Sequence, residues 1–547
     1  MKFKKNTFIQ GAFIATLGIV ISKILGIIYV IPFRAFVGKQ GGALYGYAYS
    51  IYAIFLAISQ AGVPLAMSRL ISEYNTLGEY ANKEKIFKVG RKFLNILGIV
   101  SFLILFIFAP LIASLIIGGV EGGNTTEDVV LVIRIISFAV LIVPILSVSR
   151  GYLQGHRFIT PTSISQVIEQ LVRVMIIVVG SFVCAKVLRL PLSISIGCAV
   201  GAASIGALCS YIYLRIHIKK NKKELNPVSK GDKPTLSTKE IMKMIMIYSL
   251  PLILIELFRS IFNSIDVLML VKTLVNTFGF AVNDAEYVLS IVTTWGSKLN
   301  NIIVSIVAGL MTSLIPNLTR SIVKNDKNDI NLKINQTYEI ILGIALPMAI
   351  GLSFLAPLVW NVFYGLGIND LGPITYRLLV FNAVATTVFS ATMTVAQLLK
   401  EYKLVVIGLI TGFLFKLLFN IPMMHLFNSL GIYPFYGSIS TSILAFLITS
   451  GFVMFYVIKK YKLNIKPTIK VLTNILLGLF LMVLVMSIMK IIIPFNYKDR
   501  LISLLILVIY SFVGGFIYLF YMYISRTINK IFGKDNVDKI ISKIKRH

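Results

Sequence analysis

The sequence predicts an all-α integral membrane protein with fourteen transmembrane helices, and three observations lead to that prediction. Apolar runs of about twenty residues, the length that crosses a bilayer, recur from one end of the chain to the other. Only 14% of the residues are charged and 57% are hydrophobic, whereas about a quarter of a soluble domain is charged. The runs are continuous rather than alternating, which favours helices over a membrane β-barrel.

Fourteen apolar segments account for these helices. They are expected at residues 8–31, 43–67, 92–117, 129–150, 161–186, 192–217, 243–271, 287–316, 337–363, 373–397, 403–425, 435–458, 468–493 and 501–525. The first segment is too long for the apolar region of a signal peptide and lacks a small-residue cleavage site. It is therefore expected to remain as the first span.

Repeated patterns divide the spans into two bundles. Residues 96–111 and 341–358 share an Ile-Leu-Gly followed by an Ala-Pro-Leu, and the polar corner at 153–157 has a weaker counterpart at 398–403. Six spans separate the copies, so they face the same way and form a parallel repeat, with a binding site expected between the bundles. The expected parts are an N-terminal bundle at 1–217, a cytoplasmic linker at 218–242, a C-terminal bundle at 243–458, two appended spans at 459–525 and a basic amphipathic tail at 526–547.

The net charge of +31 is explained by membrane topology. If the N-terminus lies in the cytoplasm, the links on that side carry 38 Lys and Arg residues and the opposite links carry 8. Positive charge accumulates on the cytoplasmic side of membrane proteins, so both termini are predicted to be cytoplasmic. The same distribution argues against nucleic acid as a partner.

The sequence contains no signature of catalysis or of a metal site. The cysteines Cys184, Cys198 and Cys209 lie in apolar segments and the four histidines are scattered. There is no Walker loop, no G-x-S-x-G and no pair of catalytic carboxylates. We therefore expect neither an enzyme nor an ATP-driven pump, and no cofactor.

Ionisable residues deep in the spans mark the expected binding cavity, because each costs roughly 2.5–3.5 kcal/mol to insert at the centre of a helix. One span carries Glu256, Arg259, Asn263 and Asp266 at i, i+3, i+7 and i+10, which places them on a single helix face. A polar face of this kind should border an aqueous cavity rather than lipid.

Three other spans carry deep polar residues. Lys298 and Asn301 share one helix face, and Lys23 lies in the first span. Glu169 and Arg173 can pair at i,i+4, whereas neither lysine has an acidic residue within a turn of its own helix. This excess of cations favours an anionic ligand such as a phosphate or pyrophosphate. The candidate substrate-binding residues are Lys23, Arg173, Arg259 and Lys298, and the candidates for cavity polarity or coupling are Glu169, Glu256, Asn263, Asp266 and Asn301.

The sequence leaves structural roles open for the same residues. Glu169 and Arg173 could form a purely structural ion pair, and the two lysines could extend to the membrane surface or meet a distant acid. The polar face at 256–266 could join two helices.

A block from Arg150 to Arg173 resembles a family signature; it reads RGYLQGHRFITPTSISQVIEQLVR. It is similar to the polysaccharide-exporter branch of the multidrug/oligosaccharidyl-lipid/polysaccharide superfamily, and within that branch to the stage V sporulation protein B-like group of lipid II flippases. Shorter matches at 22–26, 62–69 and 313–316 agree with it.

The resemblance implies a flippase in the bacterial plasma membrane. Its expected substrate is an undecaprenyl-pyrophosphate-linked sugar, above all the peptidoglycan precursor lipid II. The substrate is expected to move outward by alternating access, with help from the membrane potential. Related flippases often have arginine where this chain has Lys23, and a second arginine a turn later, where it has Tyr29 and then Arg34. Arg34 therefore joins the candidate substrate-binding residues. We expect a monomer whose basic tail binds anionic lipids.

Two other functions remain open. A multidrug cation antiporter of the same superfamily would be expected to have a negatively charged cavity. A non-transporting scaffold for cell-envelope or spore-cortex assembly would not depend on Lys23 and Lys298. The residues do not separate lipid II from a teichoic, capsular or spore-specific lipid-linked sugar.

Overall fold

The computed structural model describes residues 8–60, 62–225, 233–367, 370–497 and 499–532. Within these ranges all regular structure is helical and no strand is formed, which confirms the predicted all-α fold. Twelve helical segments of the described chain are long and apolar enough to cross a membrane. With α1 (Phe8–Ile28) and α12 (Gly296–Val323), of 21 and 28 residues, they are consistent with the fourteen predicted spans.

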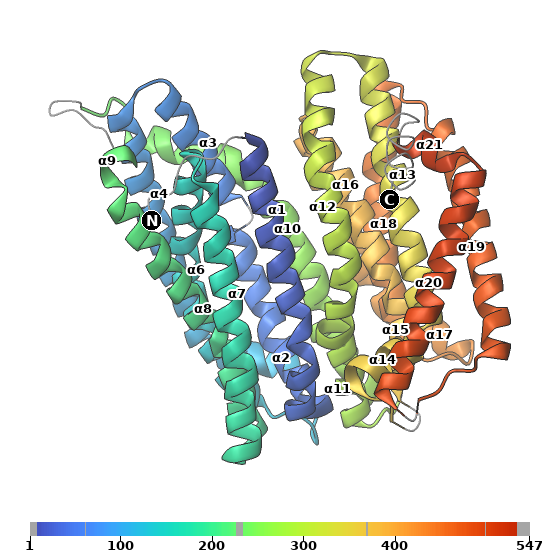
Figure 1. The fold of residues 1–547 in the computed structure, drawn as a ribbon. Helices are drawn as coiled ribbons and strands as arrows, with labels where there is room; N and C mark the ends of the chain where they lie inside the picture. The colour runs from blue at the N-terminus through green and yellow to red at the C-terminus, as the bar shows by residue number, and fades with distance from the viewer. Residues whose placement is uncertain (1–7, 61, 226–232, 368–369, 498, 533–547) are drawn as a thin grey trace. The chain divides into compact units, whose positions relative to one another are not determined.

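The chain forms two compact units, Met1–Trp295 and Gly296–His547 (Figure 1). Besides α1, unit 1 contains α2 (Val30–Gln60), α3 (Val63–Thr76), α4 (Tyr80–Ile107), α5 (Ala109–Ile117), α6 (Thr126–Gly155), α7 (Ile159–Phe182), the π-helix η1 (Val183–Val187), α8 (Leu192–Lys220), α9 (Lys222–Leu225), α10 (Thr238–Asn276), α11 (Val282–Ser290) and the π-helix η2 (Ile291–Trp295).

Besides α12, unit 2 contains nine helices in its described residues. They are α13 (Lys327–Phe354), α14 (Ala356–Tyr364), α15 (Leu371–Leu379), α16 (Phe381–Leu398), α17 (Tyr402–Ser429), α18 (Phe435–Tyr461), α19 (Lys466–Ile492), α20 (Arg500–Ile524) and α21 (Thr527–Phe532). The predicted amphipathic tail at 526–547 lies mostly outside the described residues, which end with α21 at this end of the chain.

Unit 1 extends past the polar link at 218–242, where the sequence predicted the division between bundles. Within unit 1, α10 packs against α2, α3, α4 and α5, and α11 packs against α2. The boundary of a compact unit depends on which helix faces pack together. The sequence shows only that the link between two spans is polar, and that polarity does not decide which helices pack together. The five predicted segments describe the repeat and remain a prediction.

The internal repeat is visible as a matched helix break in each unit. In unit 1, the 28-residue α4 is followed by a break at Phe108 and by the nine-residue α5. In unit 2, the 28-residue α13 is followed by a break at Leu355 and by the nine-residue α14. Both short helices have proline within their first two positions, where its missing N–H costs nothing.

The corners that follow α6 and α16 have the same backbone geometry. Arg157 and Lys400 have φ values of 63° and 62°, which is uncommon for residues other than glycine. The N–H of Arg157 donates to Gln154 O at 2.9 Å, and the N–H of Lys400 donates to Gln397 O at the same distance. This is the left-handed helix ending that satisfies the last carbonyls. The weak sequence echo at 398–403 therefore corresponds to a repeated turn.

Capping boxes fix the starts of two long helices. The Thr125 hydroxyl accepts from the N–H of Asp128 at 3.2 Å, and the Asp128 carboxylate accepts from the N–H of Thr125 at 3.1 Å. Ser237 and Glu240 make the same pair of hydrogen bonds at the start of α10. Each box satisfies two backbone donors that the helix leaves without a partner.

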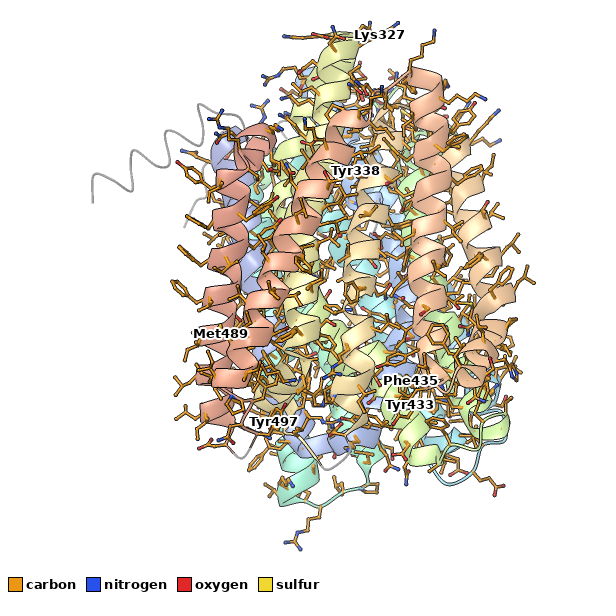
Figure 2. The ribbon with its side chains drawn as sticks, turned by 90° about the vertical axis from the view of Figure 1, so that its right-hand side faces the viewer. Lys327, Tyr338, Tyr433, Phe435, Met489 and Tyr497 are labelled. Carbon is orange, nitrogen blue, oxygen red and sulfur yellow. The ribbon has the colours of Figure 1, made fainter. Side chains whose placement is uncertain are left out.

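The two ends of unit 2 differ in composition. Figure 2 shows Lys327 at one end and Tyr433, Phe435 and Tyr497 near the other. The rings of Tyr433 and Phe435 stack with centroids 5.0 Å apart. Aromatic residues concentrate at membrane–water interfaces. The aromatic end is therefore consistent with one membrane surface.

Glycines of the family-like block allow α6 to approach α3 closely. A Cβ on Gly151 would lie 2.6 Å from the carbonyl oxygen of Pro64, and one on Gly155 would lie 2.7 Å from the Cβ of Ile71. Any larger residue would push the helices apart. Two stretches that carried the resemblance, 150–155 and 62–69, are therefore partners in one interface.

Candidate substrate-binding site

A three-residue charge network lies inside unit 1. Arg173 Nη2 donates to Glu169 Oε1 at 2.6 Å, as the i,i+4 spacing predicted. Arg150 Nη2 donates to the other carboxylate oxygen, Oε2, at 2.8 Å. The sequence suggested a balanced pair, but the structure shows two guanidinium groups around one carboxylate. The network therefore carries an excess of one positive charge.

Two serines hold Arg150 in this position. Its Nε donates to Ser165 Oγ at 3.1 Å, and its Nη2 donates to Ser210 Oγ at 3.1 Å. Ser210 Oγ in turn donates to the carbonyl oxygen of Ser165 at 2.9 Å. The three helices α6, α7 and α8 each supply part of this network, and Figure 1 shows them side by side.

A glycine makes the approach of α8 possible. A Cβ on Gly206 would lie 2.7 Å from the carbonyl oxygen of Glu169. Because glycine has no side chain there, the backbone of α8 reaches α7 at the level of the carboxylate. Packing at this point fixes Glu169 and Ser210 relative to each other.

Tyrosines of α2 lie beside the network. The rings of Tyr45 and Tyr49 stack at 4.3 Å, and Tyr49 meets Tyr52 edge-on at 5.8 Å. All three tyrosines lie near Arg173. Within the described chain, Arg173 Nε and the Tyr49 hydroxyl are buried and make no hydrogen bond. Buried polar groups are normally satisfied, so these two donors have a hydrogen-bonding capacity that the described chain does not use.

The predicted polar face of α10 is only partly accessible. Arg259 Nη2 and Glu256 Oε2 form an ion pair at 2.5 Å, with side chains 40% and 37% exposed. Asn263 is exposed, whereas Asp266 is buried. The accessible part of the face is therefore the stretch from 256 to 263.

Arg34 lies in a different environment from the network. It is buried, and its Nη2 donates to the Tyr287 hydroxyl at 3.2 Å. Its guanidinium lies 5.0 Å from the centre of the Tyr287 ring and 5.1 Å from that of Trp295. These contacts join α2 to α11 and η2. They are contacts of the kind that a packing residue makes, and the role of Arg34 in substrate binding stays a prediction.

The two candidate lysines belong to different units. Lys23 is exposed on α1, which packs on α7 through two close approaches: Gly18 at Ser163 and Gly26 at Gln170. Lys298 lies half-buried on α12 in unit 2. Asn301, one turn further along α12, is also half-buried.

A buried cation of unit 2 was not among the predicted site residues. Lys416 lies within α17 and is almost fully buried, and its Nζ donates to Ser442 Oγ at 2.8 Å. Its depth in the span was visible in the sequence, but its partner on α18 was not.

Comparison with known proteins places this chain in a family. The family described as "Polysaccharide biosynthesis protein" matches residues 8–321. The chain is also 33% identical over 558 residues to "Lipid II flippase MurJ" of Bacillus subtilis (strain 168), covering 97% of both proteins. The chain belongs to the polysaccharide biosynthesis protein family. This confirms the resemblance noted at 150–173.

Further relatives of this family member are known. "Stage V sporulation protein B" of the same organism is 28% identical over 220 residues, which is 40% of each chain. The solved structure "Lipid II flippase MurJ, inward closed conformation" matches with a TM-score of 0.61 and 17% identity, over 92% of this chain and 98% of that one. An inward-facing multidrug resistance MATE family transporter matches with a TM-score of 0.62 and 16% identity, over 82% and 99%. The structural matches show a shared fold, and the chain is a multi-pass bacterial membrane protein.

The i,i+4 spacing predicts the Glu169–Arg173 pair of this family member, but it does not predict that Arg150 joins the pair. The family match covers the whole network. The sequence places Arg150 at the end of the expected span 129–150 and not among the candidate site residues, yet α6 continues to Gly155. The serines Ser165 and Ser210, which follow no charge pattern, were also missed. The signal that could have found Arg150 was its position inside the family-like block.

Proposed function

We propose that the protein is a flippase that moves an undecaprenyl-pyrophosphate-linked saccharide, with lipid II as the leading candidate, from the cytoplasmic to the outer leaflet. The observation that carries the proposal is the positively charged Arg150–Glu169–Arg173 network beside buried donors that lack partners. The 33% identity with a lipid II flippase over 97% of the chain supports the same substrate.

The chemistry of the network suits a pyrophosphate. A guanidinium binds phosphate oxygens through paired N–H donors in a fixed plane. Arg173 uses Nη2 for Glu169, which leaves its Nε for an anion. The Tyr49 hydroxyl could donate to the same group. Glu169 holds Arg173 in place, so the donor is already oriented before the ligand arrives.

Four cations are proposed to contact the headgroup during transport: Lys23, Arg173, Arg259 and Lys298. Glu256, Asn263, Asp266 and Asn301 are proposed to set the polarity of the path. Arg34 is proposed to support the helix packing instead, because its guanidinium is engaged by Tyr287 and Trp295. The proposed role of each residue can be tested by substituting that residue alone.

The membrane potential would drive the headgroup outward. Both termini are proposed to be cytoplasmic, and the cytoplasm is electrically negative. Moving about two negative charges outward gains roughly 2.3 kcal/mol per charge per 100 mV. Alternating access with this driving force needs no nucleotide and no catalytic residue.

A multidrug cation antiporter is the second candidate, because a multidrug transporter shares the fold. The excess positive charge around Glu169 disfavours it, since a cationic drug would be repelled there. A membrane scaffold is the third candidate, and it would tolerate neutralisation of the network.

The test is translocation of a labelled lipid II headgroup in proteoliposomes, together with complementation of a strain depleted of its lipid II flippase. Arg173→Gln should slow translocation by roughly 10- to 100-fold, because a hydrogen bond to a charged group contributes about 1.5–3 kcal/mol. Arg134→Gln is the matched control, because Arg134 is an exposed arginine in the same unit. Equal rates for the two variants would overturn the proposal.

A further inference from the structure

A second basic site lies in unit 1, on a different face of α6 from the Glu169 network. A pocket of about 260 Å³ is bordered by Lys88 and Arg91 of α4 and by Arg215 and Lys219 of α8. Glu84, which pairs with Lys88 at 3.0 Å, is the one acidic residue of its lining. Four cations against one carboxylate make the pocket strongly positive.

The floor of the pocket is aromatic and rigid. Phe87 of α4 and Tyr152 of α6 lie with ring centroids 4.1 Å apart, and the guanidinium of Arg91 lies 5.7 Å from the Phe87 ring. Tyr152 also packs on His156, whose ring nitrogens contact the Tyr152 carbonyl and the Leu225 carbonyl. An aromatic floor beneath four exposed cationic side chains is suited to a compact anion.

Apolar surface begins next to these cations. Ile96 and Ile99 are exposed on α4 one to two turns beyond Arg91, and Leu208 and Ile212 are exposed on α8 before Arg215. Both α4 and α8 pack on α6, and Arg91 and Arg215 lie at the ends of the predicted spans 92–117 and 192–217, which is the level expected for a membrane surface. Basic side chains at that level attract anionic headgroups.

We propose that this pocket binds the phosphate of an acidic phospholipid, whose acyl chains lie along the exposed faces of α4 and α8. The volume corresponds to roughly eight water molecules, which accommodates a phosphate with a glycerol group. A soluble phosphate would meet the same cations but would leave the adjoining apolar surface uncovered. The observations therefore favour the lipid.

The pocket is distinct from the proposed substrate site. Arg150 and Tyr152 are two residues apart on α6, so their side chains point about 200° apart around the helix. Arg150 faces Glu169, whereas Tyr152 faces the pocket. A bound headgroup would link the ends of α4 and α8 across α6 without touching the network.

The experiment is binding of phosphatidylglycerol to the purified full-length protein in detergent, counted by native mass spectrometry, with phosphatidylcholine as the neutral comparison. Near an anionic group each Lys or Arg contributes roughly fivefold in affinity. The double variant Arg91→Gln/Arg215→Gln should therefore bind phosphatidylglycerol about 30-fold more weakly. Arg91→Lys/Arg215→Lys keeps the charge and should bind nearly as well as the unaltered protein.

Two controls make the result decisive. Lys324→Gln/Lys327→Gln removes two exposed lysines elsewhere and should leave phosphatidylglycerol binding unchanged. Equal losses in this variant and in the pocket variant would overturn the proposal, as would equal binding of the two lipids. Displacement of the lipid by millimolar glycerol 3-phosphate would assign the pocket to a soluble phosphate and would also overturn it. Circular dichroism of each variant confirms that it is folded.

Discussion

Replacing Glu169 by glutamine should destabilise the protein more than replacing either arginine of the network. Glu169→Gln leaves Arg150 and Arg173 facing each other with no anion between them, whereas Arg150→Gln leaves a neutral Glu169–Arg173 pair. Removing one partner of a buried ion pair costs about 3–5 kcal/mol. The side chains here are 11–21% exposed, so we expect the lower end, about 3 kcal/mol.

The arginine substitution should cost less. Arg150→Gln removes the guanidinium's hydrogen bonds to Glu169, Ser165 and Ser210 but leaves no unpaired charge, so it should reduce the free energy of unfolding by about 1.5–2 kcal/mol. The double variant Glu169→Gln/Arg150→Gln retains only the positive charge of Arg173, so the net charge of the network is the same as in the unaltered protein. It should therefore be at least as stable as Glu169→Gln alone, so the two changes should not add.

The assay is denaturant unfolding of the purified protein in detergent, followed by far-UV circular dichroism. All four proteins of the cycle are measured under one set of conditions, and the free energies of unfolding are compared. Equal costs for the two single variants would refute the reasoning. Strict additivity in the double variant would refute it as well, because the charges would then be screened independently.

Collapsing an inside-negative potential across proteoliposomes should slow headgroup export by at least tenfold; an unchanged rate would exclude electrophoretic transport. Gly151→Ala should destabilise the protein by about 1–3 kcal/mol in denaturant unfolding, because its Cβ would lie 2.6 Å from a backbone oxygen of α3. Gly451→Ala, which has open space around it, should be neutral or stabilising; equal losses at both glycines would contradict the packing argument. Glu401 accepts a hydrogen bond from Lys460, which lowers the pKa of the carboxyl. Its contribution to stability should therefore be present above about pH 4.3 and be lost as the pH falls further, and Glu401→Gln should remove that part of the pH dependence of unfolding.

The repeat could be predicted from the sequence because short motifs of neighbouring residues mark it. Proline suits the first turn of a helix, so the Ala-Pro pairs at 109–110 and 356–357 open new helices, and the breaks at Phe108 and Leu355 directly precede them. The turn at Arg157 and its counterpart at Lys400 were suggested by short polar corners. These features depend on a few neighbouring residues, so they can be predicted without knowing how the helices pack.

The candidate site was only partly readable because partners across helices leave no local trace. The i,i+4 spacing identified Glu169 with Arg173 but gave no sign of Arg150, Ser165 or Ser210. Nor does the sequence reveal the aromatic neighbours of Arg34, which lie more than 250 positions further along the chain.

Three properties can be derived from the sequence without any structure: the chain crosses the membrane many times, its two halves repeat, and it keeps charged residues within its spans. These properties follow from the free energy of transferring side chains into a bilayer. That free energy depends on the residues of each segment and not on the other segments. Only the tertiary structure decided that two arginines share one carboxylate and that the glycines of 150–155 meet 62–69. The physical reason is that a buried charge is stabilised by whichever groups the packing brings within hydrogen-bonding distance, and that choice is made between helices.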